Sequence, residues 1–189
     1  MSDLMPAPML ALKREVHRAH ISLRDFEDAA RFIEAAKRHD LASDEHEGLL
    51  LAALIHYARP FSRNEVDPNA AADVRLEIRG GVDAVLKTAG ELTLHQRIIN
   101  LRNKAVAHAE SEFNPMKILP KPPRDPAAGV TYLMTSSRRW HAVQENIDLD
   151  EFGRIVEAMR AYCMERLPAL GREIDRVSAQ PHDLEREQT

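Results

Sequence analysis

The sequence has 189 residues, of which 44% are hydrophobic and 30% charged, and its formal net charge is −4 at pH 7. This length and apolar content predict one domain with a full core, and the acidic balance argues against a protein that coats nucleic acid over its whole surface. A single cysteine, Cys163, excludes an internal disulfide, and the absence of a charged-then-apolar leader or a run of 18 apolar residues predicts a cytoplasmic protein that does not contact a membrane.

The first predicted element is helical. Between Met9 and Ile33, apolar residues recur three and four positions apart, which is the spacing of one buried helix face. The pattern fits one long helix over 9–38. Ser22 followed by Asp25 equally fits the start of a second helix in phase with the first, so both alternatives stay open.

A further helix is predicted to begin near Ser43, where acidic residues favour the positive end of a helix, and to end at Pro60. Residues 60–92 give a weaker pattern, because Gly80 and Gly81 interrupt it. Thr93 and Gln96 then have the spacing of a capping box in front of a narrow apolar stripe. This stripe predicts an amphipathic helix that begins at about residue 93.

Residues 113–129 contain five prolines, which predict an irregular loop. Two β-prone runs, 130–135 and 140–147, flank a charged turn and predict a small hairpin. Asp148 then begins a last helix that Pro168 is expected to kink or end. The predicted fold is therefore mainly α, a bundle of about five helices with a small β-hairpin inserted before the C-terminal helix. One domain spans 1–178, and residues 179–189 form a flexible tail.

The stretch from Leu101 to His108, LRNKAVAH, carries the clearest chemistry. Arg102 has a permanent planar charge that matches phosphate oxygens, and a histidine such as His108 can transfer a proton near neutral pH. Arg14 and His20 have the same separation, but no asparagine follows Arg14. On one ideal helix Arg102 and His108 lie about 120° apart, so the long arginine side chain, a distorted last turn or a second copy of the chain across a two-fold axis is needed to bring them together. The alternative is a histidine that caps the helix and an arginine that pairs with an acid.

The middle of the chain is basic, since residues 97–141 hold eight Lys/Arg and three Asp/Glu, a net of +5 in a chain of net −4. An anionic ligand bound locally fits this distribution. Candidate substrate-binding residues there are Lys104, Lys117, Lys121, Arg138, Arg139 and Trp140. Positive charge beside an indole suits single-stranded RNA, whereas the alternative is a charged turn with a buried tryptophan and solvated loop lysines.

Metal and cofactor chemistry find little support in the sequence. His17 and His20 lack a nearby cysteine or a third ligand, and no glycine-rich phosphate loop is present. We therefore expect neither a metal site nor a cofactor.

YARPF at 57–61 together with LRNKAVAH at 101–108 resembles the HEPN superfamily, in particular its abortive-infection-like branch. The resemblance implies an all-α core and a metal-independent endoribonuclease that acts as a symmetric homodimer in defence or stress. It maps Arg102 and His108 onto the catalytic pair and Asn103 onto the assisting polar residue, and it implies an antitoxin or other regulatory partner. Toxin members that a nucleotidyltransferase modifies carry a tyrosine two residues after the histidine, where this chain has Glu110.

Two other functions fit the same sequence. A non-catalytic helical module would use the basic middle to bind RNA or a protein, with Arg102 and His108 in structural roles. A dimeric scaffold that pairs through the apolar helix face from Met9 to Ile33 would have no affinity for RNA. Salt-dependent RNA binding distinguishes the scaffold from the other two functions.

Overall fold

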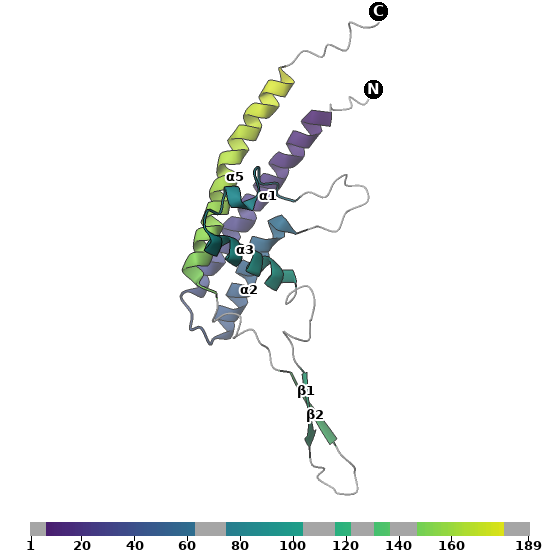
Figure 1. Cartoon of the computed structure of the whole chain (residues 1–189), viewed down its shortest axis with the longest axis vertical. Helices are drawn as coiled ribbons and strands as arrows, with labels where there is room; N and C mark the ends of the chain where they lie inside the picture. The colour runs from purple at the N-terminus through teal and green to yellow at the C-terminus, as the bar shows by residue number, and fades with distance from the viewer. Residues whose placement is uncertain (1–6, 63–74, 104–115, 122–130, 137–146, 180–189) are drawn as a thin grey trace, which may run out of the picture.

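Four α-helices form the body of the protein in the computed structural model (Figure 1), which describes residues 7–62, 75–103, 116–121, 131–136 and 147–179. Two helices of 30 residues, α1 (Ala7–Ala36) and α5 (Leu149–Ser178), pack against each other in antiparallel directions. The shorter α2 (Asp44–Ala58) packs on α1, and α3 (Ala89–Leu101) contacts both α2 and α5. The expected mainly helical fold is confirmed. The described residues contain four α-helices, so the expected count of about five is not supported.

The first helix is continuous, which decides between the two alternatives for residues 9–38. Ser22 is fully buried and Asp25 nearly so in the middle of α1, and neither begins a second helix. Phe26, Ala29 and Ile33 lie on the same buried face, as the spacing of apolar residues predicts.

The predicted boundaries of α2 are confirmed. The Ser43 hydroxyl accepts a hydrogen bond from the backbone N–H of His46 at 3.1 Å, which caps the N-terminus of the helix. The helix ends at Ala58, and the 3₁₀ turn η1 (Arg59–Phe61) holds Pro60.

The predicted start of α3 is five residues too late, because the N-cap residue is Thr88 and not Thr93. The capping box is formed by Thr88 and Glu91: the Thr88 hydroxyl accepts from the Glu91 N–H, and the Glu91 carboxylate accepts from the backbone N–H groups of Lys87 and Thr88. A carboxylate accepts two such bonds more readily than the amide of Gln96, and these bonds lower the pKa of Glu91. Thr93 lies inside the helix, where its hydroxyl donates to the Ala89 carbonyl at 2.8 Å.

The connection that leads into α3 is tied to α5. Gly80 and Gly81 have φ of 82° and 85°, the left-handed conformation that favours glycine, and the turn η2 (Val82–Ala84) follows them. The hydroxyl of Tyr162 on α5 accepts a hydrogen bond from the backbone N–H of Arg79 at 3.1 Å. This bond attaches the connection to α5 ten residues before α3 begins.

The last helix begins as predicted, because the Asp148 carboxylate accepts from the backbone N–H groups of Asp150 and Glu151. It does not end at Pro168, which lies inside a helix that continues to Ser178. Buried residues on both sides of the proline hold the helix together, since Cys163 and Leu170 are both fully buried in the core. Tertiary packing therefore offsets the lost backbone hydrogen bond.

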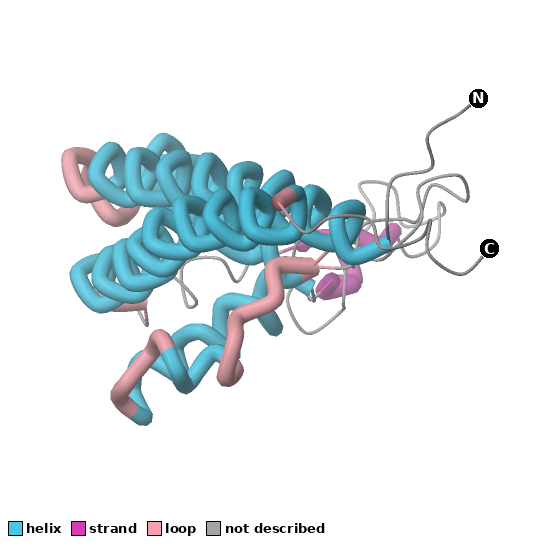
Figure 2. Tube along the Cα trace, turned by 90° about the horizontal axis from the view of Figure 1, so that it is seen from above, coloured by secondary structure: helices cyan, strands magenta, loops and turns pink. Residues whose placement is uncertain are grey.

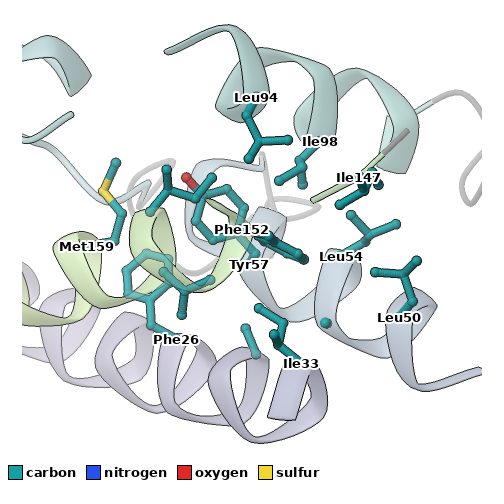
Figure 3. Packing of buried hydrophobic residues seen from close by; sticks show 14 of the residues in the cluster. Phe26, Ile33, Leu50, Leu54, Tyr57, Leu94, Ile98, Ile147, Phe152 and Met159 are labelled. Carbon is teal, nitrogen blue, oxygen red and sulfur yellow. The ribbon is translucent and has the colours of Figure 1, made fainter. Parts of the chain in front are cut away.

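All four helices contribute to one hydrophobic core (Figure 3). Aromatic rings lie at its centre: the ring of Tyr57 is 5.8 Å from that of Phe26 and 5.5 Å from that of Phe152. Leu94 and Ile98 on α3 cover these rings from above in this view. The core thus fixes the orientation of α3 relative to α2 and α5.

The predicted hairpin of 130–135 with 140–147 is not supported. Strand β1 (Met116–Lys121) pairs antiparallel with β2 (Thr131–Ser136), and Figure 2 shows both strands in magenta. The second strand lies close to the predicted run 130–135, but its partner comes from the proline-rich stretch that was expected to be irregular. Pro120 is tolerated in β1 because, among the described residues, the sheet has two strands and each of them is an edge strand. Of the expected second strand, residues 140–146 lie outside the described residues, and Ile147 is buried in the helical core.

Candidate functional site

Arg102 and Asn103 lie together at the C-terminal end of α3. Leu101, the last residue of the helix, is buried, whereas Arg102 is half-buried and Asn103 is exposed. The backbone N–H of Arg102 bonds to the carbonyls of Ile98 and Ile99, so the helical backbone extends to this residue. The core therefore anchors the end of α3 and leaves two polar side chains at the surface.

The two side chains contact each other directly. Nη1 of Arg102 donates a hydrogen bond to Oδ1 of Asn103 at 3.1 Å. A guanidinium carries five N–H donors, so this bond leaves most of them for an anion. The Asn103 oxygen is already oriented by the arginine, and its NH₂ group supplies two further donors. Together these donors suit an oxyanion such as a phosphate.

The other residues predicted to form this site are not described in the structure. His108 and Lys104 lie outside the described residues, as do Arg138, Arg139 and Trp140. Lys117 and Lys121 are placed by their backbone alone, opposite Thr135 and Thr131 in the β1–β2 pairing. The convergence of these residues on Arg102 thus stays a prediction.

A buried tyrosine–histidine pair joins α2 to α3. The Tyr57 hydroxyl and Nδ1 of His95 share a hydrogen bond of 2.8 Å, and the Phe61 ring packs edge-on against the imidazole with centroids 4.8 Å apart. Burial lowers the pKa of His95 and raises the pKa of Tyr57, so both side chains are neutral at pH 7. His95 lies seven residues before Arg102, and its contact with Tyr57 fixes the rotation of the helix that carries Arg102.

The turn that follows α2 is held by buried charges from α1. Nη2 of Arg18 donates to the carbonyls of Arg59 and Pro60, at 3.0 and 2.7 Å. The guanidinium of Arg59 lies 3.1 Å from the Asp25 carboxylate, and Nδ1 of His56 lies 3.4 Å from the same oxygen. Burial raises the pKa of Asp25, although the neighbouring Arg59, His56 and Arg18 act in the opposite direction. Within YARPF, Tyr57, Arg59 and Pro60 therefore have structural contacts.

Sequence reasoning missed most of these contacts. Arg18 occupies a position on the buried side of α1 that a spacing argument assigns to apolar residues, and Asp25 was considered only as a capping residue. No local pattern in the sequence linked His95 on α3 to Tyr57 on α2. The one available signal was the interruption of an otherwise apolar seam by charged residues.

The described residues do not provide a metal-binding cluster or a reactive thiol. In the described ranges, no group of three His, Cys, Asp or Glu side chains is arranged to hold a metal ion. Cys163 is buried in the core, and burial raises its pKa to about 12, so the thiol stays protonated. No helix in the described part of the chain is long and apolar enough to span a bilayer.

Comparison of the chain with models of protein families, with curated proteins and with solved structures finds no match.

Proposed function

We propose that this protein is a metal-independent endoribonuclease of HEPN type that cleaves single-stranded RNA in a defence or stress response. The observation that carries the proposal is the Arg102–Asn103 pair. It lies at the exposed end of a core-anchored helix, within the motif that resembles that superfamily. A mainly helical fold is compatible with the proposal.

The proposed reaction is an internal transesterification. His108 removes the proton from a ribose 2′-hydroxyl, whose oxygen attacks the adjacent phosphorus while the bond to the 5′-oxygen breaks. Arg102 stabilises the charge that develops on the phosphate oxygens, and Asn103 orients the guanidinium. The 5′-oxygen leaves with a proton that an imidazolium supplies. The products are a 2′,3′-cyclic phosphate and a 5′-hydroxyl, and no metal ion is needed.

The site is proposed to act in a cytoplasmic homodimer. A second copy across a two-fold axis would bring a second Arg102 and His108 to the RNA, which overcomes the angular separation of these residues on one ideal helix. Lys104, Lys117 and Lys121 are proposed to contact the RNA backbone, together with Arg138 and Arg139, while Trp140 stacks on a base. A regulatory partner protein of antitoxin type is part of the same proposal.

The test is cleavage of labelled single-stranded RNA in EDTA by the full-length protein. We expect Arg102→Ala and His108→Ala each to lower the rate by about 10²-fold or more. Arg172→Ala, which removes an exposed arginine near the far end of α5, should retain the wild-type rate. RNA binding without cleavage would favour the non-catalytic binding module, and absence of both would favour the dimeric scaffold.

A further inference from the structure

A row of basic side chains runs along the exposed side of the first half of α1. Lys13, His17, His20 and Arg24 are all exposed and follow one another at spacings of four, three and four residues. At 100° per residue they fall within an arc of about 60°, and at 1.5 Å per residue they span about 16 Å along the helix. We call these four residues the α1 basic stripe.

Two acidic residues in this part of α1, Glu15 and Asp25, pair with other elements, whereas the exposed Glu27 follows Arg24 by three residues on the same side of the helix. Glu15 is bonded to Arg166 of α5 at 2.8 Å, and the buried Asp25 pairs with Arg59 beyond α2. Within the described ranges of the chain, no member of the stripe forms an ion pair with an acidic side chain. The positive charge of the stripe is therefore not neutralised by these neighbouring acids.

The second half of the same helix is different. Arg31 pairs with Asp28 at 2.8 Å, and Lys37, the first residue after the helix, lies 2.8 Å from both Glu34 and Asp150. The chain as a whole carries a net charge of −4, so the stripe is a local exception and not a consequence of a generally basic composition.

We infer that the α1 basic stripe binds the phosphate backbone of single-stranded RNA. This inference rests on the proposed function, because it assigns a second contact surface for the same substrate, away from the end of α3. Lys13 and Arg24 supply permanent charges, and each imidazole between them carries at least one N–H that can donate to a phosphate oxygen. A straight row of donors about 16 Å long is suited to successive phosphates of an extended strand.

A membrane surface fits these observations less well than RNA does. A helix that lies in a bilayer interface needs an apolar face that can enter the lipid. From Ala19 onward the apolar face of α1 is buried, and Phe26 and Ile33 pack against the other helices (Figure 3), while Met9, Leu12 and Val16 are half-buried. Leu10, which is 38% exposed, is the one exposed large hydrophobic side chain among the described residues of α1, so little apolar surface accompanies the stripe.

The test is binding of a labelled 2′-O-methyl RNA to the full-length protein in EDTA, followed by fluorescence anisotropy between 50 and 200 mM salt. This RNA lacks the attacking hydroxyl and cannot be cleaved by the proposed reaction. Lys13→Gln/Arg24→Gln should raise the Kd about tenfold, which is what two surface ion pairs near the upper end of their usual strength supply. It should also make the salt dependence of log K shallower by about 1.4, or about 0.7 for each lost contact.

The matched control is Arg172→Gln/Arg176→Gln, which removes the same charge from exposed positions on α5 and should change the Kd less than about twofold. The inference would be overturned if both double variants lost RNA affinity equally, or if the stripe variant lost no RNA affinity. Binding to phosphatidylserine vesicles without binding to RNA would overturn it as well. If the stripe variant binds like wild type while Arg102→Ala abolishes cleavage, the stripe fails and the proposed function stands. If the wild-type protein binds RNA through the stripe but does not cleave it, the inference about the stripe stands and the proposed endoribonuclease function fails.

Discussion

Removal of the Tyr57 hydroxyl should destabilise the protein by about 1–3 kcal/mol. The hydroxyl and Nδ1 of His95 are 2.8 Å apart, and the histidine is only 9% exposed. In Tyr57→Phe the phenyl ring still fills the space between α2 and α3, but a buried ring nitrogen loses its partner. Such an unsatisfied group costs about 1–3 kcal/mol. For a chain of this length, the melting temperature should fall by about 3–9 °C.

The assay is urea unfolding followed by circular dichroism, with a double-mutant cycle that adds His95→Leu. Because the leucine removes the polar group that needs a partner, Tyr57→Phe should cost clearly less in the His95→Leu background than in wild type. The reasoning is refuted if Tyr57→Phe stays within about 0.5 kcal/mol of wild type, or if the two substitutions are additive.

Three other predictions follow from buried or constrained residues. Burial lowers the pKa of His95 below its ordinary value of 6.5. The stability that the neutral, buried imidazole contributes is therefore fully present above pH 6.5 and is lost as the pH falls toward the folded-state pKa. Between pH 7.5 and 5, the melting temperature should fall less steeply in His95→Gln than in wild type. Arg18→Met leaves two backbone carbonyls without their donor and should cost about 2–4 kcal/mol in urea unfolding, whereas the exposed Arg24→Met on the same helix should stay within about 0.5 kcal/mol. Pro168→Ala restores a helical N–H and should stabilise the protein by about 1–3 kcal/mol, so a lower melting temperature would show that the helix is shaped around the proline.

Hydrophobic periodicity predicted the helices well because a helix that buries one face must repeat its apolar residues every three to four positions. The seam from Met9 to Ile33 and the cap at Asp148 are local patterns of this kind, and the structure has helices at both places. The start of α3 was misplaced because two Thr-x-x-Glu/Gln pairs occur within ten residues. Spacing does not distinguish them, and the hydrogen bonds to Glu91 do.

Contacts between distant residues were beyond the reach of the sequence. Strand propensity located 131–136 but not its partner, since pairing depends on the path of the chain between the strands. The bond between Tyr57 and His95 joins residues 38 positions apart, and Arg18 reaches carbonyls more than 40 positions away. The motif named Arg102, Asn103 and His108 as candidate site residues. The structure shows the hydrogen bond between Arg102 and Asn103, whereas His108 lies outside the described residues.

The chemistry of the RNA ends tests the central proposal most directly. A 5′-labelled RNA is incubated with the protein in EDTA, and the new ends are identified by mass spectrometry. The proposed reaction predicts a 2′,3′-cyclic phosphate and a 5′-hydroxyl, both lost in His108→Ala and with a 2′-deoxy substitution at the cleaved position. A 3′-hydroxyl with a 5′-phosphate, or cleavage that EDTA abolishes, would contradict a metal-independent attack by the 2′-hydroxyl.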